Sequence, residues 1–394
     1  MNSRIESLKK TFHTAFPNAI PTVFSAPGRT EIGGNHTDHQ HGRVLCAAVN
    51  LDTVACASAN GSNIIRIRSE GYDSFDITAE FSQPTPEEYG KSVALVRGVV
   101  SRIAELGYTI GGFDACITSD VLPGSGLSSS AAFEVLIGTI INHFFCDNKI
   151  PPTEIARIGQ YAENVYFGKP CGLMDQTASA VGGAVAIDFS APAAPIVQRI
   201  DFDFAASDHT LCIIDTRSEH GDLTEDYSAI TQEMGTIAKH FGETHLRHVD
   251  EGKFRAAIPE IRKLYGDRAV LRAMHFFAED KRAAAEAEAL KNGDFTAFLS
   301  LVNESGASSS LLLENIWSPA APQQQAITLA LAMGKDLLGG RGAIRVHGGG
   351  FAGTVQAFVP NDILDDFTAG MEHIFGSGCC HVLSIRSFGG CITE

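Results

Sequence analysis

Residues 33–42 read GGNHTDHQHG and bring three histidines and one aspartate into a short stretch between glycines. Neutral imidazoles and carboxylates are good ligands for zinc and similar divalent ions, so a metal site is the first chemistry to consider. The same groups could instead hydrogen-bond a neutral polar ligand, or lie in a solvated turn. The chain contains neither HExxH nor HxHxDH, and three histidines of one loop cannot complete a hydrolase site alone. The metal site is therefore the least favoured of the three.

A second stretch, VLPGSGLSSSAAFEVLIGTII at 121–141, has the composition of a phosphate-binding loop. Gly124 and Gly126 allow backbone amides to approach an anion, and Ser128, Ser129 and Ser130 add hydroxyl donors at the start of an apolar helix. The loop matches neither G-x-x-x-x-G-K-[ST] nor G-x-G-x-x-G. A helix capped by serine after a glycine turn is an equally good explanation of this stretch alone.

A third stretch, HGGGFAGTVQAFVP at 347–360, places four glycines before an expected strand. Bare backbone of this kind suits a close approach by another group. Glycine-rich turns are common, so this signal is weak by itself.

Length and composition indicate a globular protein of about two domains, since 394 residues can bury two cores. Hydrophobic residues make up 44% of the chain and charged residues 19%, which excludes a disordered protein. The formal net charge of −16 argues against a nucleic-acid partner, because such binding relies on clustered Lys and Arg.

The first residues, MNSRIESLKKTFHTAFP, have apolar side chains at helical spacing but lack the uninterrupted apolar core of a signal peptide. No stretch has the length of a membrane span. Nine cysteines without a CxxC pair are typical of small buried side chains in a reducing compartment. We therefore expect a cytoplasmic protein without a membrane partner, as a monomer or weak dimer.

Hydrophobic periodicity predicts a mixture of strands and helices. The expected strands are 44–49, 63–69, 210–215 and 354–359. The expected helices are 92–106, 131–145, 154–166, 227–241 and 270–291. The segment SAPAAPI at 190–196 is the expected crossing between domains.

Taken in order, the three stretches resemble the motifs of the GHMP family of small-molecule kinases, most closely its galactokinase branch. The motifs read APGRTEIGGNHTDHQHGRVL, PGSGLSSSAA and GGGFAGT, and a fourth region, CGLMDQTASAVGG at 171–183, is similar to the galactokinase segment that carries the catalytic aspartate. Weaker similarity continues through 268–295 and 302–312, so the resemblance covers nearly the whole chain.

The resemblance implies a two-domain α+β fold with the active site between the domains. The implied domains are an N-terminal ribosomal-S5-like domain at 1–189 and a C-terminal ferredoxin-like α/β domain at 190–394. It further implies that ATP and Mg²⁺ are used to phosphorylate the anomeric hydroxyl of galactose, giving galactose 1-phosphate. The histidine and aspartate stretch would then line a sugar pocket.

Phosphoryl transfer needs an aligned hydroxyl, neutralised phosphate charge and a proton acceptor. The resemblance makes Asp175 the catalytic base and Arg29 the group that keeps it ionised and stabilises developing charge. On residue types alone, a buried ion pair that only organises the domain explains both equally well. The resemblance also implies that Glu163, otherwise a typical surface glutamate, holds Mg²⁺ together with a serine-loop hydroxyl, for which we choose Ser130.

The resemblance implies sugar contacts from Asn35, His36, Asp38, Gly172 and Tyr227. The Asp38 carboxylate can accept hydrogen bonds from two vicinal hydroxyls, which suits the 3- and 4-positions of a hexose. Tyr227 could instead pack in the core. The expected ATP-binding residues are Gly124, Ser125, Gly126, Leu127, Ser128, Ser129, Ser130, Gly349 and Gly350.

Two departures from the galactokinase pattern bear on the substrate. Where that branch reads G-E-H-T-D-Y-N, this chain has Asn35 in place of the glutamate that contacts the 6-hydroxyl of the sugar, and residues 30–33 read TEIG instead of V-N-L-I. Asn35 can still hydrogen-bond that hydroxyl, but it does not repel a negative charge. The following His39 and Gln40 are similar to the D-H-Q-G of galacturonate kinases. A galacturonate or N-acetylgalactosamine 1-kinase is therefore an alternative, and Asn35 is expected to alter specificity at C6.

A second alternative is a sensor that binds galactose and ATP without turnover. Such members of the family have a shortened serine loop, whereas the segment SSSAA is complete here. Because an active site must hold every catalytic role, the presence of Arg29, Asp175 and this loop favours an enzyme.

Overall fold

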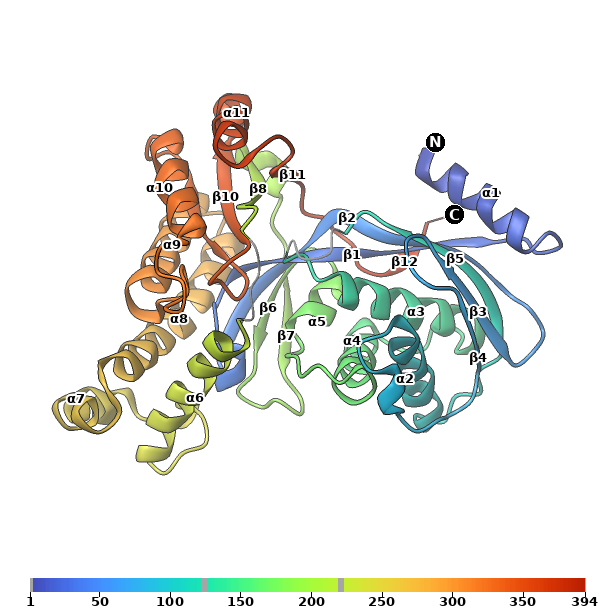
Figure 1. The fold of residues 1–394 in the computed structure, drawn as a ribbon, viewed down its shortest axis with the longest axis horizontal. Coiled ribbons are helices and arrows are strands. Elements are labelled where there is room, and N and C mark those ends of the chain that lie inside the picture. Colours follow the sequence, from blue (N-terminus) through green and yellow to red (C-terminus); the bar gives the residue numbers. More distant parts are fainter. Residues whose placement is uncertain (1–2, 122–125, 219–222, 394) are drawn as a thin grey trace. The chain divides into compact units, whose positions relative to one another are not determined.

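The structure is a computed structural model that describes residues 3–121, 126–218 and 223–393, with helices and strands mixed along the chain (Figure 1). The chain forms two compact units. Unit 1 contains Met1–Arg29, Ala48–Gly183 and Arg386–Glu394, and unit 2 contains Thr30–Ala47 and Ala184–Ile385. Strands β1 (Thr22–Gly33) and β2 (Arg43–Ala59) contribute residues to both units, so the units do not follow a single cut at residue 189.

The strands of unit 1 pair in the order β12, β1, β2, β5, β3 and β4. Neighbours β2 and β5 (Phe113–Ser119) run antiparallel, whereas β3 (Ile64–Ser69) runs parallel to β5. The edges are the short strands β12 (Cys391–Ile392) and β4 (Phe75–Thr78). Short edges limit the exposed backbone available for pairing with other chains.

Helices cover both faces of this sheet (Figure 1). On one face lies α1 (Ser3–Ala15), whose buried Leu8 and Phe12 pack with Val54 and Cys116. On the other face lie α2 (Ser92–Glu105), α3 (Ser129–Phe145), α4 (Pro152–Tyr161) and α5 (Met174–Val181). A Cβ added to Gly98 of α2 would lie 2.6 Å from the Cα of Ala162, so glycine permits the close contact between α2 and the end of α4.

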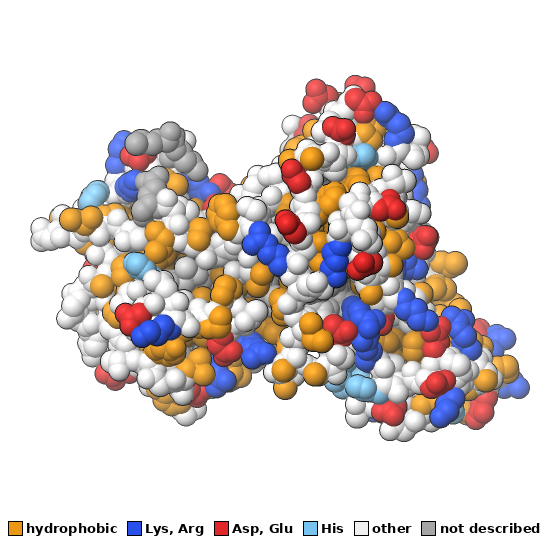
Figure 2. Space-filling view, turned by 180° about the vertical axis from the view of Figure 1, so that it is seen from behind, with side chains coloured by type: hydrophobic (Ala, Val, Ile, Leu, Met, Phe, Trp, Pro, Cys, Tyr) orange, Lys and Arg blue, Asp and Glu red, His pale blue; other side chains and the backbone are white. Residues whose placement is uncertain are grey.

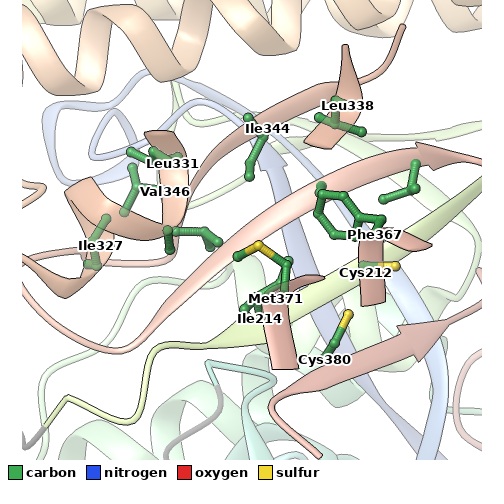
Figure 3. Close-up of a cluster of buried hydrophobic side chains, with 14 of the residues drawn as sticks. Cys212, Ile214, Ile327, Leu331, Leu338, Ile344, Val346, Phe367, Met371 and Cys380 are labelled. Atoms are coloured by element: carbon green, nitrogen blue, oxygen red, sulfur yellow. The ribbon is translucent and has the colours of Figure 1, made fainter. Parts of the chain in front are cut away.

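Unit 2 contains a four-stranded antiparallel sheet in the order β11 (Cys380–Leu383), β8 (His209–Asp215), β10 (Thr354–Pro360) and β9 (Ala343–His347). Helices α10 (Ala326–Leu338) and α11 (Leu364–Phe375) supply apolar side chains to its core. Figure 3 shows Phe367 and Met371 of α11 beside Cys212 and Ile214 of β8. This packing makes β10 part of a stable element.

The remaining strands of unit 2 form a hairpin. Strand β6 (Ala184–Asp188) pairs with the first residues of β2, from Arg43 to Ala47, and with β7 (Ile196–Ile200). The segment 190–196 therefore links two strands within unit 2 and is not a crossing between units, which corrects our expectation; the chain returns to unit 2 at Ala184.

Four helices complete unit 2: α6 (Thr224–His240), α7 (Glu251–Tyr265), α8 (Asp267–Lys291) and α9 (Phe295–Ser308). Apolar side chains of α6, α7 and α8, among them Met234, Phe254 and Phe276, form one buried cluster. The burial of these side chains fixes α8, which carries polar residues used in the site below.

Each strand or helix predicted from periodicity overlaps an element of the same type in the structure. The expected strands coincide with parts or all of β2, β3, β8 and β10, and the expected helices with α2, α3, α4, α6 and α8. One difference concerns 154–166, where the α-helix ends at Tyr161 and a π-helical turn, Ala162–Phe167, follows. Turns of this kind are rare and occur often at functional sites.

None of the helices within the described ranges is long and apolar enough to cross a membrane. On the face that Figure 2 displays, Lys and Arg side chains lie among Asp and Glu side chains.

Candidate active site

Arg29 and Asp175 form a bidentate ion pair in unit 1. Arg29 Nε donates to Asp175 Oδ1 at 2.7 Å, and Nη2 donates to Oδ2 at 2.8 Å. Arg29 is 8% exposed, whereas the side chain of Asp175, in the first turn of α5, is 26% exposed. The fork geometry fixes the orientation of the carboxylate and leaves part of it accessible.

Opposing effects set the pKa of Asp175. Burial raises it, but the charge of Arg29 and hydrogen bonds from Arg29 and Ser128 outweigh burial, so the net pKa is below the usual value. The carboxylate is therefore ionised at neutral pH.

The serine loop is tied to this ion pair. The Arg29 backbone N–H donates to the Leu127 carbonyl at 3.0 Å, and Arg29 Nη1 donates to the Gly126 carbonyl. Ser128 precedes α3 with φ of +60°, and its hydroxyl donates to Asp175 instead of capping the helix. The explanation of this loop as a serine-capped helix is therefore wrong for Ser128. The predicted residues Gly124 and Ser125 lie outside the described residues.

Glu163 is buried, not solvated as a lone helical glutamate normally is. It lies in the π-helical turn and is 2% exposed. The Ser130 hydroxyl donates to Glu163 Oε1 at 3.0 Å, and Lys169 Nζ lies 3.4 Å from the same oxygen. Gln176 Nε2 bridges Glu163 Oε2 at 2.9 Å and Glu134 Oε2 at 3.0 Å.

The second carboxyl of this cluster belongs to Glu134, whose Oε2 accepts from Gln176. Burial raises its pKa well above the usual value, and the neighbouring charge of Glu163 raises it further. Ser130 and Glu163 offer two hard oxygen donors in this cluster. In the described ranges no group of three or more His, Cys, Asp or Glu side chains is arranged to hold a metal ion. The two donors fit Mg²⁺, which needs few protein ligands when phosphates and water supply the rest.

A cavity of about 330 Å³ opens beside Ser129 and Ser130 in unit 1. Its walls combine apolar and polar side chains from α2, α3, β3 and β5. The residues that form it include Ser69, Tyr72, Leu95, Ile117, Ser129, Ser130, Phe133 and Phe167. A mixed cavity of this size can hold a flat, partly polar group.

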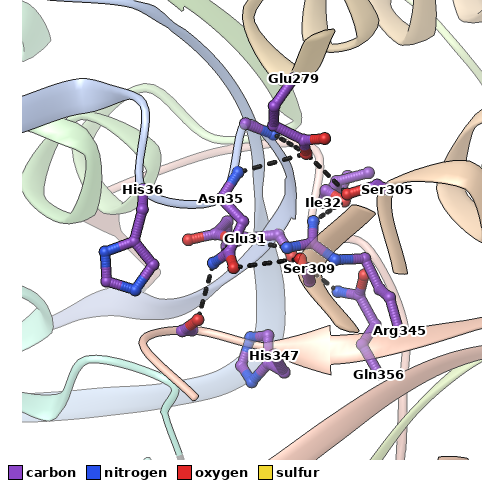
Figure 4. A network of polar contacts seen from close by, with 12 residues as sticks. Glu31, Ile32, Asn35, His36, Glu279, Ser305, Ser309, Arg345, His347 and Gln356 are labelled. Atoms are coloured by element: carbon purple, nitrogen blue, oxygen red, sulfur yellow. Dashed lines mark hydrogen bonds and ion pairs between the residues drawn. The ribbon is translucent and has the colours of Figure 1, made fainter. Parts of the chain in front are cut away.

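The predicted sugar residues Asn35, His36 and Asp38 lie in unit 2, in the loop that follows β1 (Figure 4). Asn35 is 1% exposed, and His36 and Asp38 are half-buried. His36 adopts φ of +57°, and its Nε2 lies 2.9 Å from the Gly349 carbonyl oxygen. The loop therefore reaches the glycine-rich turn before β10.

Tyr227 of α6 contacts the same turn. Its hydroxyl donates to the Gly350 carbonyl at 3.1 Å, and its ring meets the Phe351 ring edge to face at 5.4 Å. A Cβ added to Gly349 would lie 2.5 Å from Tyr227 Cε1, so only glycine fits there. Gly172 is exposed and precedes Asp175 in unit 1. Unit 2 thus brings Tyr227, His36, Gly349 and Gly350 together.

The other histidines of the opening stretch have different surroundings. Burial, followed by the nearby charge of His36, lowers the pKa of His39 to about 3, and neither of its buried ring nitrogens has a hydrogen-bond partner among the described residues. His41 stacks on His245 with ring centroids 3.5 Å apart. The three histidines are therefore not arranged around a common point.

Two family models match this sequence. That for the N-terminal domain of GHMP kinases matches residues 94–183, and the galactokinase galactose-binding signature matches residues 10–59. This sequence therefore carries one domain match to GHMP kinases and one galactokinase signature.

Solved structures with the same fold include kinases of small molecules. Galactokinase of Lactococcus lactis complexed with galactose is 22% identical, with 99% of this chain and 100% of that chain covered and a TM-score of 0.81. Mevalonate kinase of Methanococcus jannaschii is 15% identical, with coverage of 94% and 99% and a TM-score of 0.64. A D-glycero-D-manno-heptose 1-phosphate kinase from Bacteriodes thetaiotaomicron is 17% identical, with coverage of 95% and 99% and a TM-score of 0.64. The expected GHMP kinase fold of the α+β class is confirmed.

The sequence analysis missed the residues that support the loop at 34–38. His275 and Glu279 of α8, Asn315 and Arg345 contact residues 31–35, although all are more than 200 positions away. The available signal was a histidine and a glutamate four positions apart in a mostly apolar helix. Such a pair lies on one helix face, and its burial indicates a polar partner.

The two departures from the galactokinase pattern contact each other in this chain. Asn35 Nδ2 donates to Glu31 Oε1 at 2.9 Å. The carboxylate and the amide thus occupy exchanged positions relative to the N and E of the usual motif.

Proposed function

We propose that this protein is an ATP- and Mg²⁺-dependent sugar 1-kinase that converts galactose to galactose 1-phosphate. The observation that carries the proposal is the bidentate pair of Arg29 and Asp175, bound through Gly126, Leu127 and Ser128 to the serine loop of a GHMP kinase. The galactose-binding signature over residues 10–59 supports the choice of sugar.

Asp175 accepts the proton of the anomeric hydroxyl as that oxygen bonds to the γ-phosphorus of ATP and the bond to the departing ADP oxygen breaks. Arg29 holds the carboxylate ionised and oriented for that transfer, and its cationic charge stabilises the charge that develops on the phosphoryl group. The low pKa of Asp175 suits a group that must be ionised before the sugar arrives, while tight positioning compensates for weak basicity.

Gly126 to Ser130 bind the phosphates at the start of α3, where backbone N–H groups and the helix dipole favour an anion. The cavity formed by Leu95, Phe133 and neighbouring residues receives the adenosine part of ATP. Ser130 and Glu163 would hold Mg²⁺, which when bound supplies neutralisation of phosphate charge.

The sugar is bound by His36, Asp38 and Tyr227 of unit 2. Asp38 is half-buried and carries a carboxylate able to accept from two vicinal hydroxyls. Gly349 and Gly350, which lie beside His36 and Tyr227, bring bare backbone next to the same group of side chains. We propose that Gly349 and Gly350 also contribute to ATP binding.

The test is a coupled ADP-release assay with Mg²⁺-ATP and separate additions of galactose, galacturonate, N-acetylgalactosamine, glucose and mevalonate. We expect turnover that depends on galactose and is abolished in Asp175→Asn. Preference for galacturonate would favour the alternative substrate, which the similarity of His39 and Gln40 to the D-H-Q-G of galacturonate kinases supports. Sugar binding without ADP release from any addition would reject the kinase and favour a sensor.

A further inference from the structure

The carboxamide of Asn35 is fully occupied inside the protein. Its Nδ2 donates to Glu31 Oε1 at 2.9 Å and to the Gly348 carbonyl at 2.7 Å. Its Oδ1 accepts from Asn315 Nδ2 at 2.9 Å and from the Ser309 hydroxyl at 3.3 Å. A primary amide offers two N–H donors and two acceptor positions, so these four contacts use all of them. With 1% exposure, the side chain has nothing left for a sugar hydroxyl.

The partner of this amide belongs to a buried ion pair. Glu31 Oε1 also accepts from Arg345 Nη2 at 2.8 Å, and Arg345 is fully buried and donates in addition to the Ile32 carbonyl (Figure 4). A buried guanidinium that loses its carboxylate is strongly destabilising, which keeps Glu31 in place. The position of the Asn35 side chain is thus set by β9 and by β1.

The backbone of Asn35 is held independently from α8. Glu279 Oε1 accepts from the N–H of Gly34 at 3.1 Å and from the N–H of Asn35 at 3.3 Å. The Asn35 carbonyl can only accept, so the His275 Nε2 that lies 2.9 Å away carries the proton and donates. Burial raises the pKa of Glu279, but the charges of His275, Arg345 and Arg282 outweigh it and lower the pKa, so this acceptor is ionised.

These contacts lie directly before His36, whose φ of +57° is uncommon for a residue with a side chain. A backbone in that region persists only where the surroundings hold it. Asn35 is the residue held from both sides, and His36 and Asp38 follow it in the loop.

We propose that Asn35 is a positioning residue: paired with Glu31, it fixes the loop that presents His36 and Asp38, and it does not contact the 6-position of the sugar. This inference rests on the proposed sugar kinase function. It replaces the expectation that Asn35 itself selects between a hydroxyl and a carboxylate at C6. The discrimination at C6 belongs to other groups of the site.

The experiment is an isosteric exchange cycle of the pair, with Asn35→Asp, Glu31→Gln and the double variant. Asn35→Asp places a second carboxylate against Glu31 and removes both N–H donors, so we expect KM for the sugar to rise about 10- to 100-fold while KM for ATP changes less than about 2-fold. The double variant restores one carboxylate facing one amide, but it leaves Arg345 without the Glu31 carboxylate and the Gly348 carbonyl without its donor. We therefore expect its KM for the sugar to lie between that of Asn35→Asp and that of the unaltered protein.

The sugar panel separates positioning from direct contact. If Asn35 only positions the loop, Asn35→Asp weakens the binding of galactose and of galacturonate by the same factor. Binding is measured as KM for a sugar that is turned over and as an inhibition constant for a sugar that is not. If Asn35 contacts C6, its new negative charge repels galacturonate selectively, and the ratio of the two constants changes tenfold or more. The second result would overturn the proposal.

The chain provides a matched control on its surface. Asn292 Nδ2 donates to Glu288 Oε1 at 3.2 Å, which is the same Glu and Asn pair at the same spacing, with both residues exposed. Asn292→Asp should leave both Michaelis constants unchanged, because solvent screens an exposed pair.

Amide hydrogen exchange of residues 33–42 tests the same four proteins without any turnover. Faster exchange in each single variant, with partial recovery in the double, supports the proposal, and identical exchange in all four overturns it. If the unaltered protein phosphorylates no sugar, the proposed function fails, while the exchange result still decides whether Glu31 and Asn35 hold the loop.

Discussion

Replacing Arg29 by methionine is the sharpest test of the catalytic arrangement. Methionine retains an unbranched side chain but removes the two hydrogen bonds to Asp175 and the one to the Gly126 carbonyl. Asp175 then loses the positive charge that outweighs burial, so its pKa rises.

The structure sets the size of the effect. Removing one partner of a buried ion pair costs about 3–5 kcal/mol, and we take the lower end because 26% of the Asp175 side chain is exposed. If that cost is borne in the transition state, about 3 kcal/mol corresponds to a loss of roughly 100-fold in kcat/KM.

The pKa of Asp175 determines the direction in which activity changes with pH. In the unaltered protein the folded pKa of Asp175 lies below its ordinary value, so the carboxylate is ionised from weakly acidic pH upward and its stabilising effect is lost only as pH falls through that low pKa. In Arg29→Met the raised pKa moves this transition upward. We therefore expect the remaining activity to rise with pH over a range in which the unaltered protein is flat.

The assay is kcat/KM between pH 5.5 and 8.5 for the unaltered protein, Arg29→Met, Asp175→Asn and the double variant. Because the two residues act as a unit, the double variant should be little worse than Asp175→Asn alone. Arg66→Met is a matched control, since it removes another arginine and aspartate pair of unit 1, at 2.9 Å from Asp114, away from the serine loop. A pH profile for Arg29→Met parallel to that of the unaltered protein, with additive losses, would refute the reasoning and leave an ion pair that is only structural.

Three further predictions follow from other parts of the molecule. Glu163→Gln or Ser130→Ala should raise the Mg²⁺ concentration for half-maximal activity at least about tenfold, without changing the affinity for free sugar measured by calorimetry. Leu95→Trp should fill part of the cavity and raise KM for ATP several-fold, and an unchanged KM would mean that the nucleotide lies elsewhere. Because the folded pKa of His39 is about 3 and the unfolded value is 6.5, the unfolded state binds the proton first and stability falls as pH drops below 6.5. When the pH is lowered from 7 to 5, the free energy of unfolding of His39→Phe should therefore fall by about 2 kcal/mol less than that of the unaltered protein, measured by thermal unfolding scans. Equal decreases in the two proteins would contradict the burial of the ring.

The helices and strands followed from local information. The alternation of 63–69 and the helical periodicity of 92–106 record which face of each segment is buried, and β3 and α2 lie there. The π-helical turn that carries Glu163 was not visible, because nothing in its composition distinguishes a π turn from one more turn of α4. The hairpin at 184–200 was also missed, since a run of Pro and Ala marks a break in structure without indicating whether it joins domains or strands.

The amino-acid sequence by itself determined the chemistry that is available: a glycine and serine loop for an anion, an arginine and an aspartate in separate motifs, and a polar stretch suited to a sugar. Tertiary structure decided which of these groups act together. It joined Arg29 to Asp175, turned Ser128 toward that carboxylate, and gave Glu163 a buried place beside Ser130.

The same division applies to Asn35. Its identity as a departure from the usual motif was visible in the sequence, but its partners Glu279 and Asn315 are 244 and 280 positions away. Hydrogen-bond satisfaction in a buried site depends on every group that folding brings within about 3 Å, and no local pattern encodes such distant neighbours. The sequence could therefore say that the amide differs from a carboxylate, and only the folded chain could show that all of its hydrogen bonds are already made.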